Sequence, residues 1–89
     1  MIAVEIRLFG AFRKYESQCM PLRISINKPA TIAKIKKALA EKFHEMVLNF
    51  SDAQLITDSA MADDYRILPL EEIVDRSCVL SILPPVCGG

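Results

Sequence analysis

The chain has 89 residues, of which 52% are hydrophobic and 25% are charged, a balance typical of one folded domain and not of a disordered chain. Eleven basic residues balance eleven acidic residues, so charge gives no reason to expect binding to nucleic acid or to an anionic membrane. No apolar run approaches the roughly 20 residues that cross a bilayer, and the first residues lack the basic flank of a signal peptide. We therefore expect a cytoplasmic protein.

The first two elements are predicted to be strands. Residues 2–8 alternate between apolar and polar side chains, which is typical of a strand with one face in the core. Gly10 and the charged stretch RKYES, residues 13–17, are expected to form a loop. A second alternating run over residues 20–27 predicts a hairpin partner, with Pro21 at its beginning or on an edge.

A helix is predicted to follow. Thr31 is a candidate N-cap, and apolar residues recur after it at helical spacing: Ile32, Ile35, Leu39 and Phe43. Charged side chains occupy the opposite side of this helix. The pattern predicts an amphipathic helix that lies over a sheet.

The second half of the chain reads as three further strands. AQLIT (residues 53–57) and DYRIL (residues 64–68) are interpreted as short strands, and residues 70–74 allow one helical turn after Pro69. CVLSIL (residues 78–83) is nearly all apolar, as expected of a central strand. The order strand, strand, helix, strand, strand, strand predicts a two-layer α+β domain.

The thiols and the single histidine do not suggest a metal site. Cys19, Cys78 and Cys87 are widely spaced without a C-x-x-C pair, and His44 stands apart from them. This spacing predicts neither a disulfide framework nor a structural zinc site. Cys19 and Cys78 are interpreted as buried small apolar residues.

The last six residues, PPVCGG, are predicted to form an arm. Pro84 and Pro85 lack an amide hydrogen and have a fixed φ, so sheet pairing should stop at this point. Gly88 and Gly89 have no Cβ, which would let this end enter a narrow channel. The arm would reach roughly 20 Å, with the α-carboxylate of Gly89 as its reactive group. That carboxylate needs an ATP-dependent partner, because the chain shows no phosphate-binding loop or nucleophile–base pair.

With these features the chain resembles the ubiquitin-like β-grasp sulfur carriers, and within them the small subunits of molybdopterin synthase. The resemblance covers the whole chain and rests on three stretches: IAVEIRLFGAFRK, TIAKIKKAL and the terminal PPVCGG. It implies an α+β β-grasp domain over residues 1–83, in which one main helix packs on one face of a mixed sheet of four to five strands. Residues 84–89 would form a flexible tail.

The resemblance also implies a function. Gly89, preceded by Gly88, would carry sulfur as a thiocarboxylate and donate it to a cyclic pyranopterin precursor in molybdopterin (molybdenum cofactor) biosynthesis. An E1-like adenylyltransferase would use ATP to charge Gly89, and the chain itself would bind no cofactor. As a non-catalytic co-substrate, it would insert its tail into the large subunit of molybdopterin synthase, in a heterotetramer of two small and two large subunits.

Three alternatives remain open from the sequence. The chain could carry sulfur in another pathway, such as thiamin synthesis or tRNA thiolation. It could be a ubiquitin-like modifier that is joined to lysines through Gly89. It could also be a binding module whose tail does no chemistry.

The tail departs from the family pattern at Cys87, which follows Val86 where the family usually has a small or hydroxyl residue. Cys87 is interpreted as a tolerated small residue, since a thiol near its ordinary pKa is only slightly ionised. The alternative is a transient acyl disulfide between Cys87 and charged Gly89.

The strand phases predict a partner surface. In a β-grasp sheet the first and last strands are parallel neighbours, so Phe9 and Leu83 would lie on the uncovered face near the start of the tail. An exposed apolar cluster usually marks a contact site, and the resemblance matches these two residues to the family's apolar contact positions. Met61 is a third candidate. The alternative is two ordinary half-exposed residues.

Overall fold

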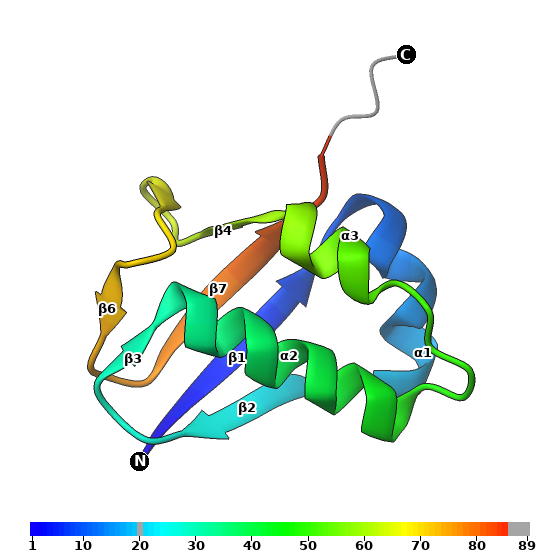
Figure 1. Ribbon diagram of the computed structural model, residues 1–89, viewed down its shortest axis with the longest axis horizontal. Coiled ribbons are helices and arrows are strands. Elements are labelled where there is room, and N and C mark those ends of the chain that lie inside the picture. The colour runs from blue at the N-terminus through cyan, green and yellow to red at the C-terminus, as the bar shows by residue number, and fades with distance from the viewer. Residues whose placement is uncertain (20, 86–89) are drawn as a thin grey trace.

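The computed structural model describes residues 1–19 and 21–85 (Figure 1). Within that part, five strands form one mixed sheet in the order β2-β1-β7-β4-β5, and a small two-stranded sheet pairs β3 with β6. The strands are β1 (Ile2–Leu8), β2 (Leu22–Ile26), β3 (Ala30–Thr31), β4 (Ala60–Ala62), β5 (Ile67–Leu68), β6 (Ile73–Val74) and β7 (Cys78–Leu83). The predicted α+β β-grasp architecture is confirmed.

The centre of the sheet follows the predicted alternation. β1 pairs antiparallel with β2 and parallel with β7, and β7 pairs antiparallel with β4 on its other side. Every second residue of β1 is buried: Ile2, Val4, Ile6 and Leu8. Because the side-chain period of a strand is two, this register fixes which residues of β7 face the core.

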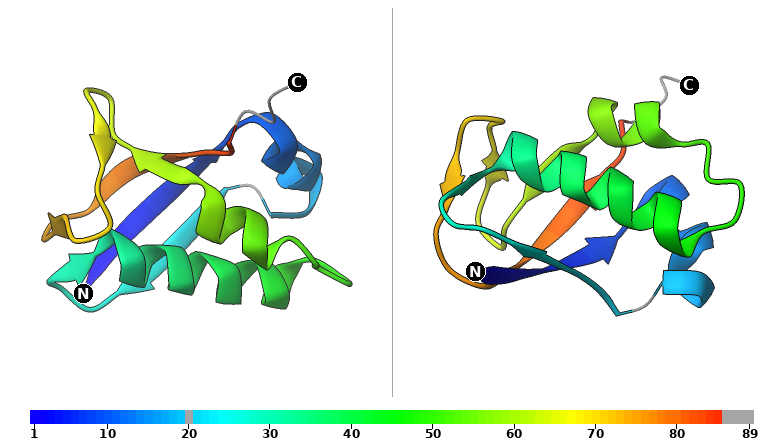
Figure 2. Two further views of the ribbon diagram at one scale, coloured as in Figure 1. Left: turned by 45° about the horizontal axis from the view of Figure 1, so that its top comes forward. Right: turned by 60° about the horizontal axis from the view of Figure 1, so that its bottom comes forward.

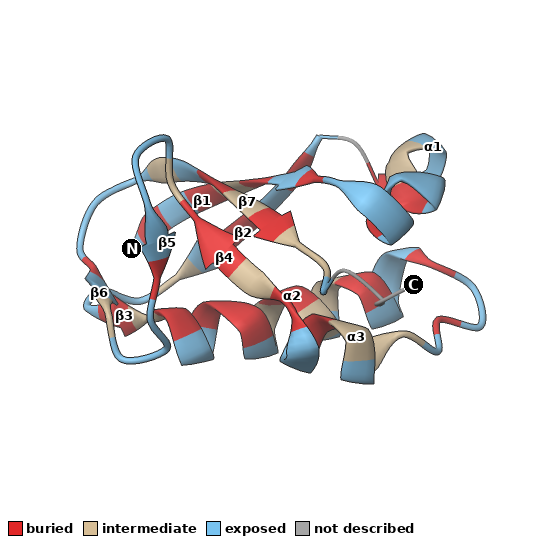
Figure 3. Cartoon of the chain, turned by 90° about the horizontal axis from the view of Figure 1, so that it is seen from above, coloured by how far each residue is buried: buried red, intermediate tan, exposed pale blue. Residues whose placement is uncertain are grey.

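One face of the sheet is covered by the main helix, α2 (Ile32–Met46) (Figures 2 and 3). The helix begins where predicted, since the Thr31 hydroxyl oxygen accepts the backbone N–H of Lys34 at 3.2 Å. Its predicted apolar face is fully buried, as Ile35, Leu39 and Phe43 are 0% exposed. Each such side chain contributes about 1.5–3 kcal/mol by leaving water.

The region after β1 is helical, which corrects the predicted loop. η1 (Gly10–Tyr15) is a 3₁₀ helix and α1 (Glu16–Cys19) continues it. Phe12 and Tyr15 are buried, and the ring of Phe43 lies 6.2 Å and 5.2 Å from theirs, between centroids. These aromatic contacts outweigh the local charge of RKYES, which suggested a loop.

The prediction of strands at residues 53–57 and 64–68 is largely wrong. The first segment is a helix, α3 (Ala53–Asp58), and in the second only β5 is extended. Lys36, from α2, donates from Nζ to the backbone oxygens of Thr57 at 2.8 Å and Ser59 at 2.7 Å. The end of α3 is therefore completed by a side chain distant in sequence, a partner that local patterns do not reveal.

Two smaller elements also differ from the expectation. β4, which no sequence pattern predicted, connects α3 to the sheet by pairing with β7. Residues 70–74 form a turn followed by β6, which pairs with β3 at the start of α2. Within residues 1–19 and 21–85, no helix has the length and apolar character that crossing a membrane requires.

Candidate functional site

The predicted tail begins where the chain leaves the sheet, at the end of β7, which lies between β1 and β4. Leu83 still pairs with Ala60, whereas Pro84 and Pro85 lie outside any strand, as predicted for residues without an amide hydrogen. Pro84 is half-buried and Pro85 is exposed. The other predicted tail residues, Val86, Cys87, Gly88 and Gly89, lie outside the described residues.

β1 ends at the same edge of the sheet as β7, because the two strands are parallel. In Figures 1 and 2 the turn from β1 into η1 lies beside the end of β7. Gly10, at the start of η1, has a φ of +57° and lies directly against Pro84. The sequence predicted only a loop at Gly10, and the available signal for its role was the glycine itself.

Phe9 and Leu83 have the predicted orientation. Leu8 and Ile82 are paired and buried, so Leu83, the next residue of β7, points to the other face of the sheet. Phe9 continues β1 in an extended conformation and is 43% exposed. Val79, on the same face of β7, is 38% exposed. We call Phe9, Val79 and Leu83 the apolar face; its role as an interface stays a prediction.

Met61 is not part of this face, which corrects the sequence analysis. Its side chain is 1% exposed, and it pairs with Ile82 and Leu68, which are both buried. Met61 therefore points into the core under α2. Successive residues of a strand point to opposite faces of the sheet. Because the sequence did not predict β4, an alignment error of one residue was enough to place Met61 on the wrong face.

Charged side chains of β1 share this face of the sheet, since Glu5 pairs with Val79 and Arg7 pairs with Ser81. Arg23 Nε donates to Glu5 Oε1 at 3.2 Å, and Arg7 lies 4.0 Å from Asp64. All four groups are at least one-third exposed, so each pair contributes little to stability. The face therefore combines apolar and charged side chains, as protein-binding surfaces commonly do.

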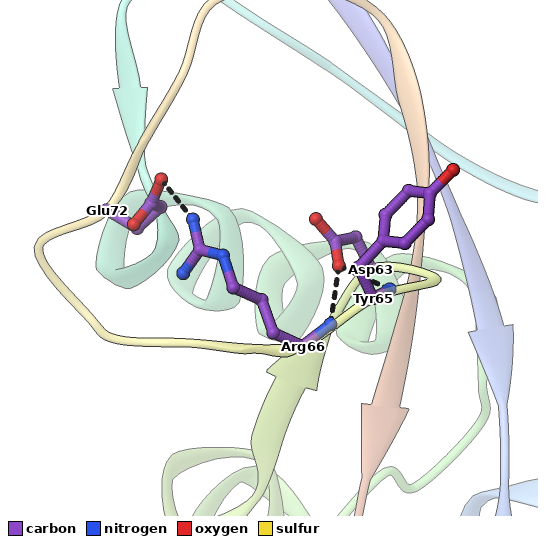
Figure 4. Close-up of polar contacts among 4 residues, drawn as sticks. All are labelled: Asp63, Tyr65, Arg66 and Glu72. Atoms are coloured by element: carbon purple, nitrogen blue, oxygen red, sulfur yellow. Dashed lines mark hydrogen bonds and ion pairs between the residues drawn. The ribbon is translucent and has the colours of Figure 1, made fainter.

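The turn between β4 and β5 is held by Asp63 (Figure 4). Its Oδ1 accepts the backbone N–H of Tyr65 at 2.8 Å and that of Arg66 at 2.9 Å. These two hydrogen bonds lower the pKa of the Asp63 carboxyl, because they stabilise its charged form. Arg66 in turn donates to Glu72 Oε2 at 2.9 Å. The Asp63 carboxylate is therefore used to hold this turn.

The described thiols are poor nucleophiles. Burial raises the pKa of both Cys19 and Cys78, so both stay protonated near neutral pH. Cys19 Sγ donates to the backbone oxygen of Tyr15 at 3.0 Å. In the described part of the chain, no three His, Cys, Asp or Glu side chains gather as a metal site would require.

Comparisons with known proteins agree on one family. The model of the ThiS family matches residues 6–89. The molybdopterin synthase sulfur carrier subunit of Synechococcus elongatus is 30% identical over 82 residues, which covers 91% of this chain and 90% of that protein.

Solved structures share the fold. SAMP1 from Haloferax volcanii superposes with a TM-score of 0.62 at 21% identity, covering 98% of this chain and 99% of that one. A Pyrococcus furiosus protein assigned as molybdopterin converting factor, subunit 1, gives a TM-score of 0.65 at 22% identity, covering 97% of this chain and all of that one (100%).

Proposed function

This chain belongs to the ThiS family of ubiquitin-like sulfur carriers, and from that premise we propose that it is the small subunit of molybdopterin synthase. The observation that carries the proposal is its 30% identity, over nine-tenths of both chains, to the molybdopterin synthase sulfur carrier subunit of S. elongatus. The match to the family model extends through residue 89, so Gly88 and Gly89 belong to the shared region.

The first chemical step is activation of the Gly89 carboxylate. A carboxylate is a poor electrophile, so an E1-like adenylyltransferase joins it to the AMP portion of ATP and pyrophosphate leaves. A sulfide equivalent then attacks the acyl carbon, AMP leaves, and Gly89 becomes a thiocarboxylate.

The second step is delivery. The charged tail enters the large subunit of molybdopterin synthase, and its sulfur passes to a cyclic pyranopterin precursor. Water cleaves the acyl–sulfur bond, which restores the Gly89 carboxylate for another round. A dithiolene contains two sulfur atoms, so each product consumes two charged chains, consistent with an assembly of two small and two large subunits.

The position of the tail supports this role. The strand that leads into it, β7, has neighbours on both sides, and its Leu80 and Ile82 are 2% and 0% exposed. Pro84 therefore follows directly on the stable centre of the domain. We propose that the apolar face beside it, Phe9 and Leu83 above all, docks on the large subunit and on the activating enzyme, so that the tail and the docking surface act together.

A modifier function is the second candidate, because the fold is shared with SAMP1, the small archaeal modifier protein 1 of Haloferax volcanii, at a TM-score of 0.62. In that case a lysine amine, not a sulfur donor, would attack the activated Gly89. A carrier in thiamin synthesis or tRNA thiolation would be charged in the same way as a molybdopterin carrier and would differ only in the acceptor.

Intact-mass measurement separates a sulfur carrier from a modifier. The chain is incubated with the activating enzyme, ATP and a sulfur donor, and a sample without ATP is the control. A sulfur carrier gains the mass difference between sulfur and oxygen, located at Gly89 by fragmentation. Lysine-linked adducts would instead support the modifier, and an unchanged mass would refute both. Deletion of Gly88 and Gly89 should abolish the mass change.

A further inference from the structure

Gly10 occupies a position where two independent constraints disfavour a side chain. Its φ of +57° lies in the left-handed region, which residues with a Cβ adopt at a cost. In addition, a Cβ at Gly10 would lie 2.6 Å from Pro84 Cγ and 3.4 Å from Pro84 Cδ. The first constraint concerns the turn itself, whereas the second concerns the residue with which the tail begins.

The contact joins two parts of the chain that are fixed by other interactions. On one side, the turn is closed by the backbone N–H of Phe12, which donates to the backbone oxygen of Phe9 at 3.1 Å, and Phe12 is fully buried. On the other side, Pro84 follows the paired residue Leu83 and has a fixed φ. The ring of Pro84 therefore rests on a surface that its neighbours hold in place.

We infer that Gly10 is a positioning residue: its contact with Pro84 sets the direction in which the tail leaves the domain, and so presents the terminal carboxylate to a partner's active site. This inference rests on the proposed function, because it assumes that Gly89 is activated. The arm from Pro84 to Gly89 spans at most about 20 Å when extended, so the direction of its root limits the positions that the terminal carboxylate can reach. A misplacement of about 1 Å can already slow a reaction a hundredfold.

Leu83 keeps its backbone pairing with Ala60 in either case, so this part of the apolar face does not depend on the contact. Loss of the contact should therefore affect the step in which the carboxylate reacts more than the binding of the partner. If Gly10 had a purely structural role, its substitution would lower the stability of the domain and would affect partner binding and the reaction of the carboxylate alike.

The test is ATP–pyrophosphate exchange catalysed by the activating enzyme, measured as kcat and KM for the full-length chain. Four variants are compared with the wild type: Gly10→Ala, Pro84→Ala, the double variant and Asn49→Ala. Asn49 is exposed and has a φ of +59°, so Asn49→Ala places an alanine in the same backbone conformation away from the tail. Urea unfolding of each variant measures the accompanying change in stability.

Gly10→Ala should lower kcat about tenfold, with KM within twofold of the wild type, and Asn49→Ala should change neither. In the Pro84→Ala background the colliding Cγ is gone, so Gly10→Ala should change kcat less than twofold, even if it destabilises both backgrounds equally. A wild-type kcat for Gly10→Ala, or the same loss in both backgrounds, would overturn the inference.

Exchange reports formation of the adenylate, which a carrier and a modifier both need. If the wild-type chain supports exchange but gains no sulfur, the proposed function is refuted. The effect of Gly10→Ala on exchange would still test the positioning role of Gly10. Absence of exchange with the wild-type chain would overturn both.

Discussion

Replacing Leu83 by glutamate should weaken binding to the large subunit of molybdopterin synthase. Leu83 is partly exposed in the free chain, so docking removes a minor part of its side chain from water, which contributes up to about 1 kcal/mol. A carboxylate placed against an apolar partner surface would also lose water without compensation, at a cost of at least about 2 kcal/mol. The sum of about 3 kcal/mol corresponds to a rise in Kd of roughly a hundredfold.

Isothermal titration calorimetry at one fixed ionic strength measures this Kd. Leu48→Glu is the matched control, because it makes the same change of charge at a leucine that is 87% exposed in the turn after α2. Unfolding midpoints of both variants show whether the fold is retained. If the two variants bind within threefold of each other, the apolar face is not the docking surface and the argument from its exposure fails.

Three further predictions concern stability and the tail. Lys36→Met should lower the free energy of unfolding by about 1–3 kcal/mol, because it removes the donor to the backbone oxygen of Thr57; an unchanged urea midpoint at pH 7 would contradict this. Hydrogen bonding by Tyr15 lowers the pKa of Asp52. The Asp52 carboxylate therefore stabilises the fold above about pH 3.9, and this stabilisation is lost as the pH falls through the lowered pKa of the folded state. The melting temperature of Asp52→Asn should consequently fall less steeply below about pH 4 than that of the wild type, and parallel curves would count against the Asp52 contact. Cys87→Ser should keep the thiocarboxylate lifetime within twofold, because a thiol with a pKa of about 8.5 is largely protonated; a several-fold change in lifetime would instead favour the acyl disulfide.

Sequence reasoning recovered the elements whose burial is periodic. The alternation of β1 and the helical spacing after Thr31 each reflect one continuous face packed on the core. The resemblance predicted the parallel pairing of β1 with β7, which is confirmed. Together with the strand phases, this pairing gave the correct faces for Phe9 and Leu83. In these segments, local pattern and tertiary environment agree.

The errors occurred where distant residues determine local structure. Residues 53–57 contain Ile and Thr, which favour strands, yet Lys36 binds the carbonyls at the end of α3. Met61 lies in a strand of three residues, too short for its alternation to indicate a face. The contact of Gly10 with Pro84 joins residues 74 positions apart, so only the folded chain reveals it.

The most direct test of the sulfur-carrier account follows the sulfur atom itself. The chain is charged with isotopically labelled sulfur, purified, and mixed with the large subunit and the cyclic pyranopterin precursor. The account predicts that the label appears in the dithiolene of molybdopterin while the mass of the chain returns to that of the carboxylate form. Label that stays on the chain, or product that forms equally well with a chain lacking Gly88 and Gly89, would contradict it.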